Sequence, residues 1–133
     1  MPTAVDSSVL LDVLLNDPLH AESSGSALRN KMQPGLIICE IVIAEITPVL
    51  AAASIQEFFF DWRIKFVPTS IESAILAGEM FHAYLRRGGK RGRVVPDFLV
   101  AAHAQLHAGS LLARDRGYYR DYFQNLNLLE PQK

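Results

Sequence analysis

The hydrophobic positions of the chain fall into short apolar runs separated by longer segments with helical periodicity. The short runs have the length of strands, and several are rich in β-branched residues, as buried strands are. The predicted strands cover residues 3–6, 36–39, 65–68, 111–113 and 126–131. The predicted helices cover residues 7–17, 19–31, 40–53, 54–64, 70–87 and 97–108. Short buried strands that alternate with helices predict an α/β three-layer domain with a short, mainly parallel sheet flanked by helices.

Turn and cap residues sharpen three of these boundaries. Pro48 is expected to kink the helix predicted over 40–53 or to begin a new turn, because proline lacks a backbone N–H. Ser54, with Glu57 three residues later, has the capping-box pattern of a helix start. Gly88 and Gly89 follow the helix predicted over 70–87 and indicate its end.

Composition limits the class of protein. A chain of 133 residues is long enough for one domain with a sizeable core, so we expect a single domain over residues 1–133. Cys39 is the only cysteine, which excludes an internal disulfide and a cysteine zinc cluster and fits a reducing cytoplasm. The first residues show no signal-peptide pattern. The longest apolar run, 36–53, contains two glutamates and a proline, which disfavours a membrane span.

The net charge of −1 hides an uneven distribution. From Arg86 to Arg120 eight basic residues face two acidic ones, whereas the rest of the chain has five basic and twelve acidic residues. Such asymmetry indicates a side that faces a polyanion, although a solvated surface produces similar clusters. The two interpretations stay open at this point.

Four acidic residues from separate predicted elements are candidates for one site. Asp6 and Asp115 follow predicted strands, Asp97 opens a predicted helix, and Glu45 lies on the helix after the strand 36–39. Functional groups of parallel sheets gather at the carboxyl ends of the strands. The four carboxylates could therefore meet at one edge of the sheet.

Each acid also has a purely structural interpretation. Asp6 could cap the following helix, Asp97 could interact with the helix dipole, and Asp115 could begin a turn. Glu45 could face solvent on a narrow stripe, since an unpaired buried charge is very costly. Periodicity does not separate Glu45 from Glu40, which could also contribute.

Carboxylates that converge repel one another and therefore require a cation or raised pKa values. Oxygen ligands without a thiolate or an obvious histidine set favour Mg²⁺ or Mn²⁺ over zinc. Such an ion lowers the pKa of a bound water and holds a phosphate oxygen. Together with the basic stretch, this chemistry favours hydrolysis of phosphodiesters.

Four stretches in this order resemble the PIN-domain family, in particular the VapC-type ribonuclease toxins of toxin–antitoxin pairs. The matching stretches are "VDSSVLL" (5–11), "IVIAEI" (41–46), "VVPDFLVAAHA" (94–104) and "LLARDRGYYRDYF" (111–123). The resemblance implies that Asp6, Glu45, Asp97 and Asp115 are the metal-binding and catalytic acids, with Ser8 as a hydroxyl that orders the site. It also implies endoribonuclease activity, a homodimer, and a small antitoxin protein that inserts a segment into the active-site groove.

The chain departs from the family pattern at two positions. Ala113 stands where family members often have Thr, and Gly117 stands where many have a further Asp. Both departures bear on how firmly Asp115 and its water are held.

Basic residues near the last acid suggest how RNA would be held. "RRGGKRGR" (86–93) is either a mobile loop that follows phosphates, with salt-dependent binding, or a solvated connector. Arg114 and Arg116 flank Asp115 and are either phosphate clamps or ordinary surface arginines.

Two further patterns are best explained by packing. "FFFDW" (58–62) spreads four aromatic residues over a wide helix arc, so that part of it could be partner surface while the core takes the rest. His103 and His107 have a spacing that suits zinc, but no third ligand is evident, and we interpret them as packing histidines.

The sequence thus predicts a Mg²⁺- or Mn²⁺-dependent ribonuclease that hydrolyses RNA as the toxin of a toxin–antitoxin pair. The alternative is a non-catalytic PIN-like scaffold that binds RNA or a protein partner. A phosphatase or a DNA nuclease that uses the same acids is a third interpretation.

Overall fold

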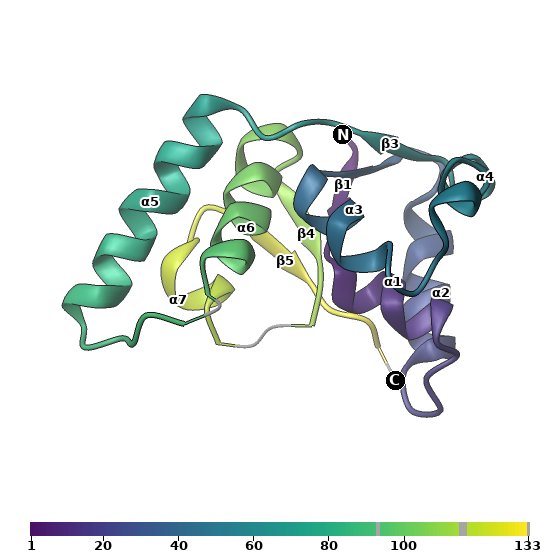
Figure 1. Ribbon diagram of the computed structural model, residues 1–133, viewed down its shortest axis with the longest axis horizontal. Coiled ribbons are helices and arrows are strands. Elements are labelled where there is room, and N and C mark those ends of the chain that lie inside the picture. Colours follow the sequence, from purple (N-terminus) through teal and green to yellow (C-terminus); the bar gives the residue numbers. More distant parts are fainter. Residues whose placement is uncertain (93, 115–116, 133) are drawn as a thin grey trace.

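A computed structural model describes residues 1–92, 94–114 and 117–132. Its centre is a sheet of five parallel strands in the order β3-β2-β1-β4-β5 (Figure 1). The strands are β1 (Thr3–Val5), β2 (Leu36–Ile38), β3 (Ile64–Phe66), β4 (Ser110–Leu112) and β5 (Asn127–Leu129). On the central strand, Ala4 is paired with Ile37 on one side and with Leu111 on the other.

Helices surround this sheet. They are α1 (Ser7–Leu14), α2 (Ala21–Lys31), α3 (Glu40–Ile46), η1 (Ala52–Ser54), α4 (Ile55–Trp62), α5 (Ile71–Arg86), α6 (Val95–His107) and α7 (Tyr119–Tyr122). Helix α6 contacts β1 and β4, and α5 packs against α6. Helices α1 and α2 pack against each other on the right of Figure 1.

The core lies where the apolar runs of the sequence become strands and helix faces. Its fully buried side chains include Leu10, Leu36, Ile38, Phe98 and Leu111. Because helices cover the three inner strands, these strands do not alternate buried and exposed residues: β1 and β2 are buried throughout, and β4 is buried after the half-buried Ser110. The α/β class predicted from that pattern is confirmed, and the sheet is parallel at every pairing.

Some predicted boundaries are wrong. The helix predicted over 40–53 ends at Ile46, because Pro48 cannot donate the backbone hydrogen bond that would continue it. Ser54 precedes α4 but makes no side-chain capping bond, so the capping box predicted there is wrong. A capping box is present instead at Ser70 and Ser73, at the start of α5. In the described part of the chain no helix is long and apolar enough to cross a membrane.

Candidate active site

Asp6 lies directly after β1, at the carboxyl end of the central strand. It is the N-cap of α1, and only 4% of its surface is exposed. Its Oδ2 accepts hydrogen bonds from Ser8 Oγ at 2.6 Å and from Ser8 N at 3.4 Å. Among the described residues nothing donates to Oδ1, and no basic side chain pairs with this carboxylate. The capping interpretation of Asp6 is therefore confirmed, and Oδ1 still has the capacity to hold a ligand.

Glu45 reaches the same edge from α3. Its Oε1 accepts a hydrogen bond from Ser7 Oγ at 3.0 Å. Ser7 is the residue next to Asp6, and α1 packs against α3. Glu45 is exposed, as the solvent-facing interpretation predicted. The bond from Ser7 nevertheless holds its carboxylate beside the residue that follows Asp6 in the sequence.

Asp97 stands in the first turn of α6, where Pro96 occupies one of the first two positions. Helix α6 ends at His107 and β4 begins at Ser110, and the two elements lie against each other (Figure 1). Such a short connection reverses the chain, so the start of α6 lies towards the carboxyl ends of β1 and β4. Asp97 is half-buried there, and its charge suits a helix start.

The fourth predicted acid, Asp115, and its neighbour Arg116 lie outside the described residues. Within residues 1–92, 94–114 and 117–132, no group of three or more His, Cys, Asp or Glu side chains is arranged to hold a metal ion. The predicted ligand set of four acids therefore stays a prediction. What the structure brings together is the end of β1, α3 and α6, the three elements that carry its first three members.

Asp12 on α1 is a fifth acid, which was not predicted from the sequence. It is 3% exposed, and both of its carboxylate oxygens are engaged. Oδ2 accepts a hydrogen bond from Ser24 Oγ at 2.6 Å, and Oδ1 pairs with Nη2 of Arg114 at 2.6 Å. The signal was available, because Asp12 interrupts the apolar stretch "VLLDVLL" much as Glu45 interrupts its own. Arg114, for which a phosphate clamp and an ordinary surface arginine were both left open, has one N–H group bound to Asp12.

Glu40, which the sequence did not separate from Glu45 as a possible ligand, is hydrogen-bonded to the loop before α5. Its Oε1 accepts hydrogen bonds from Thr69 N at 3.0 Å and from Thr69 Oγ1 at 2.8 Å. Desolvation raises the pKa of Glu40, but the hydrogen bonds from the backbone and Thr69 outweigh it, so the pKa lies below its usual value. These contacts show that Glu40 anchors the loop before α5.

The two histidines pack as predicted. His103 is buried, and its Nε2 lies 2.7 Å from the carbonyl oxygen of Val67. His107 lies within hydrogen-bond distance of the hydroxyls of Ser70 and Ser73. Burial is the main cause that lowers the pKa of His103. A neutral His103 ring with its proton on Nε2 can donate the hydrogen bond to the carbonyl of Val67.

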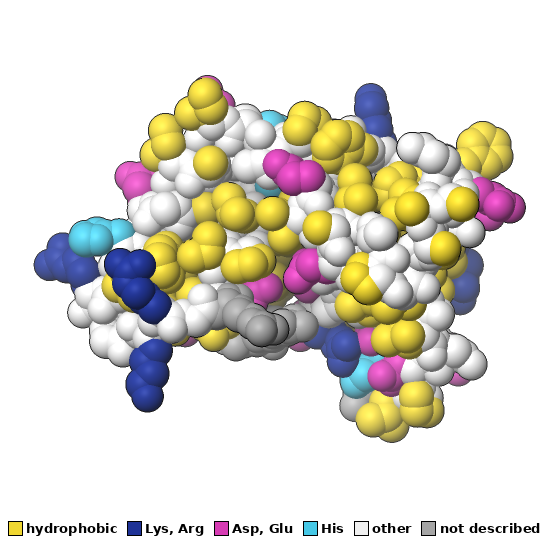
Figure 2. Space-filling view, viewed as in Figure 1, with side chains coloured by type: hydrophobic (Ala, Val, Ile, Leu, Met, Phe, Trp, Pro, Cys, Tyr) yellow, Lys and Arg dark blue, Asp and Glu magenta, His cyan; other side chains and the backbone are white. Residues whose placement is uncertain are grey.

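The basic segment after α5 is anchored at several described positions. Tyr84 donates a hydrogen bond from its hydroxyl to the carbonyl of Lys90 at 3.1 Å. Arg87 lies 5.2 Å from the ring centre of Tyr122, and Arg91 lies 5.9 Å from that of Phe81. The charged groups nevertheless reach the surface, where Figure 2 shows Lys and Arg side chains gathered over the end of α5. A role towards RNA phosphates stays a prediction.

The aromatic stretch of α4 is divided between core and surface. Phe59 is 8% exposed, whereas Phe60 is 83% exposed. Phe60 lines a groove with Phe66 of β3 and Ile43 of α3. The prediction that the core takes only part of this arc is confirmed.

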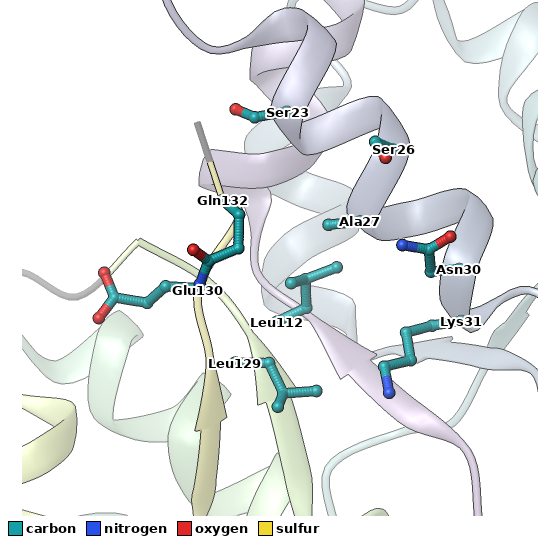
Figure 3. Close-up of a pocket in the computed structure, with 9 residues that line it drawn as sticks. All are labelled: Ser23, Ser26, Ala27, Asn30, Lys31, Leu112, Leu129, Glu130 and Gln132. Carbon is teal, nitrogen blue, oxygen red and sulfur yellow. The ribbon is translucent and has the colours of Figure 1, made fainter.

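A separate cavity of about 220 Å³ lies between α2 and the end of β5. Figure 3 shows Lys31 and Asn30 of α2 on one side and Leu129 and Glu130 on the other. Of the predicted acids that the structure describes, Asp6, Glu45 and Asp97, none lines this cavity. It is therefore distinct from the edge of the sheet where Asp6 lies.

The donor groups near Asp6 fit a hard divalent cation. Asp6 is a buried carboxylate with no basic partner among the described residues, and a buried charge of that kind requires compensation. The predicted ligands Asp97 and Glu45 are carboxylates on the neighbouring helices α6 and α3, and oxygen ligands suit Mg²⁺ or Mn²⁺. On the face shown in Figure 2, acidic side chains are visible between α6 and α3.

Three solved structures are similar to this chain over nearly its whole length. VapBC2 from Rickettsia felis, bound to a DNA fragment from the promoter, is 18% identical with a TM-score of 0.77, covering 99% of this chain and 100% of that one. FitAcB from Neisseria gonorrhoeae is 17% identical with a TM-score of 0.70, covering 96% of each chain. DNA-bound VapBC from Salmonella typhimurium is 16% identical with a TM-score of 0.73, covering 98% of each chain.

These structures share the fold. No curated protein matches the sequence. The family model described as PIN domain, however, matches residues 3–123, a range that includes Asp6, Glu45, Asp97 and Asp115. The chain belongs to the PIN-domain family, whose members are generally nucleases.

Proposed function

We propose that the protein is a divalent-metal-dependent endoribonuclease and the toxin of a toxin–antitoxin pair. The observation that carries the proposal is the carboxylate of Asp6, buried at the end of β1 with Oδ1 unengaged among the described residues. Glu45 is bonded to the adjacent Ser7, and Asp97 opens the helix that packs on β1. Membership of the PIN-domain family and the similar VapBC structures support the nuclease class and the antitoxin partner.

The side chains have separate tasks in this proposal. Ser8 holds Oδ2 of Asp6, so the carboxylate is oriented before a ligand arrives. Asp6, Glu45, Asp97 and Asp115 would hold Mg²⁺ or Mn²⁺, which when bound supplies an activated water and charge compensation at the phosphate. The basic residues Arg87 and Lys90 would hold the RNA backbone beside this edge, so that the scissile phosphate is presented for in-line attack.

The proposed assembly is a homodimer in the cytoplasm that binds a small antitoxin protein. The exposed aromatic side chain of Phe60 supports a contact with another chain, since a large apolar group open to water favours association.

Cleavage of a defined RNA in the presence of Mn²⁺ tests the proposal. Wild-type protein is expected to cut RNA and to leave matched DNA and phosphomonoesters intact. RNA cleavage is expected to stop when a chelator is added. Asp6→Asn and Asp97→Asn are expected to reduce cutting to background. Asp61→Asn, which changes an exposed acid on α4, serves as the control and keeps wild-type activity. Cutting that a chelator does not affect would contradict the metal-dependent mechanism.

The alternative is a non-catalytic PIN-like scaffold that binds RNA or a partner. One observation favours it: within the part of the chain that the structure describes, no three acidic, histidine or cysteine side chains form a metal-binding group. RNA binding that persists without any cutting, in wild type and in both acid variants, would support this alternative.

A further inference from the structure

Asp12 is a buried carboxylate that the proposed reaction does not use. It lies on α1, less than two turns after Asp6, and is 3% exposed. A buried carboxylate is tolerated when its oxygens are hydrogen-bonded and its charge is paired. Here Ser24 on α2 supplies a hydroxyl to Oδ2, and Arg114 supplies a guanidinium N–H to Oδ1.

The partner of Asp12 stands at a special place in the fold. Arg114 is the second residue after β4 and immediately precedes Asp115 in the sequence. Its backbone N–H lies 3.4 Å from Ser8 Oγ, the same hydroxyl that donates to Asp6. Arg114 is therefore bound at both ends, with its main chain next to the hydroxyl that holds Asp6 and its side chain fixed to α1.

The contacts form one continuous path across the candidate site. The path runs from Asp6 to Ser8, then to the main chain of Arg114, and from its side chain to Asp12. It joins the carboxyl ends of β1 and β4, which are neighbours in the sheet and also share the bond from Asp6 N to the carbonyl of Leu112. Without the ion pair, the segment after β4 would lose its side-chain attachment to α1.

We propose that Asp12 is a positioning residue for the metal site, acting through Arg114. By holding the guanidinium of Arg114, Asp12 fixes the main chain of Arg114 against Ser8, and Ser8 in turn keeps the carboxylate of Asp6 oriented for a metal ion. The inference rests on the proposed metal-dependent function. Groups that orient metal ligands from outside the coordination shell typically change metal affinity by about 10- to 100-fold when they are removed.

A titration of Mn²⁺ into the metal-free full chain without RNA tests the inference, because it measures affinity apart from cleavage. Asp12→Asn and Arg114→Gln are both expected to weaken Mn²⁺ binding about tenfold or more. Whether Arg114→Gln weakens or strengthens Mn²⁺ binding decides between two explanations. If the pair acted only through its charges, removal of a cation near the site would strengthen Mn²⁺ binding. Weaker binding of both variants therefore supports positioning, and unchanged or tighter binding by Arg114→Gln overturns it.

Two further variants separate positioning from general stability. Ser24→Ala removes the other hydrogen bond of Asp12 but keeps its pair with Arg114, so it is expected to lower thermal stability while Mn²⁺ affinity stays within about twofold. Arg114→Lys keeps the charge but lacks the planar guanidinium fork, and weaker Mn²⁺ binding than in wild type is expected. Wild-type affinity in Arg114→Lys would contradict the inference even if Arg114→Gln did not fold.

The outcomes also distinguish this inference from the function on which it rests. Wild-type protein that binds no Mn²⁺ overturns both. Wild-type protein that binds Mn²⁺ and loses it in Asp6→Asn, with Arg114→Gln as tight as wild type, supports the metal site and overturns the role of Asp12 alone.

Discussion

Ser7 Oγ on α1 donates a hydrogen bond to Glu45 Oε1 on α3 at 3.0 Å, across 38 positions of the chain. The contact joins the residue after Asp6 to an acid from a separate helix. It shows how one edge of the sheet collects carboxylates that are far apart in the sequence. Glu45 is exposed, and the bond from Ser7 contributes to the position of its carboxylate.

Ser7→Ala is expected to remove one of the contacts that position Glu45. A hydrogen bond to a charged group contributes about 1.5–3 kcal/mol, but here the carboxylate regains water, so the loss of stability should stay near the lower value. Binding of Mn²⁺ is expected to weaken by about tenfold, as for other groups that orient ligands. Calorimetric titration measures it. Ser26→Ala, at an exposed serine of α2, is the control and keeps wild-type affinity; equal affinities of the two variants would contradict the role of Ser7.

His103 is expected to make the stability of the fold depend on pH. Burial lowers its pKa below 6.5, and the neighbouring His107 acts in the same direction, while the carbonyl of Val67 and the charge of Glu40 oppose it. As the pH falls below 6.5, the unfolded chain takes up a proton on His103 before the folded protein does. The free energy of unfolding therefore decreases as the pH falls from 6.5 towards the lower pKa.

His103→Gln tests this dependence, because glutamine keeps an N–H for the carbonyl of Val67 but does not titrate. The melting temperature of wild type is expected to fall more steeply between about pH 7.5 and about pH 5 than that of the variant. Parallel curves for the two proteins would show that His103 does not cause the dependence.

Phe59 and Phe60 are neighbours on α4 with opposite surroundings, at 8% and 83% exposure. Phe59→Ala is expected to reduce the free energy of unfolding by about 3–5 kcal/mol, because it leaves a cavity in the core. Phe60→Ala is expected to stay within about 0.5 kcal/mol of wild type, as surface substitutions do. Denaturant unfolding measures both. Similar losses in the two variants would mean that Phe60 is covered in solution, and a dependence on protein concentration would identify a second copy as the cover.

The strands were predictable because each lies in a short segment in which at least two of three residues are apolar, between segments with helical periodicity. Residues 36–38 illustrate this, because three consecutive buried aliphatic residues have the length of a strand and are too few for a helix. Boundaries failed where a single interaction decides them. Helix α3 ends before Pro48, and the cap predicted at Ser54 occurs at Ser70, where Ser73 and not a glutamate completes the box.

The sequence points to candidate acids but not to their contacts. Asp6 and Asp97 were chosen for their positions at element ends and Glu45 for its apolar surroundings, and their role as metal ligands stays a prediction. The pairing of Asp12 with Arg114 spans 102 positions, and local periodicity contains no information on contacts of that range. The short helix α7 was missed for a similar reason, because four residues without apolar periodicity are fixed by packing of Tyr119 into the core.

Anomalous diffraction from crystals of the full chain soaked in Mn²⁺ tests whether Asp6 and Asp97 hold a divalent metal ion. We expect one strong anomalous peak at the carboxyl edge of β1 and β4, in contact with carboxylate oxygens of Asp6 and Asp97. The peak is expected to be lost in crystals of Asp6→Asn. A map in which Mn²⁺ binds only elsewhere, or in which the Asp6 and Asp97 carboxylates are too far apart to share an ion, would contradict this expectation.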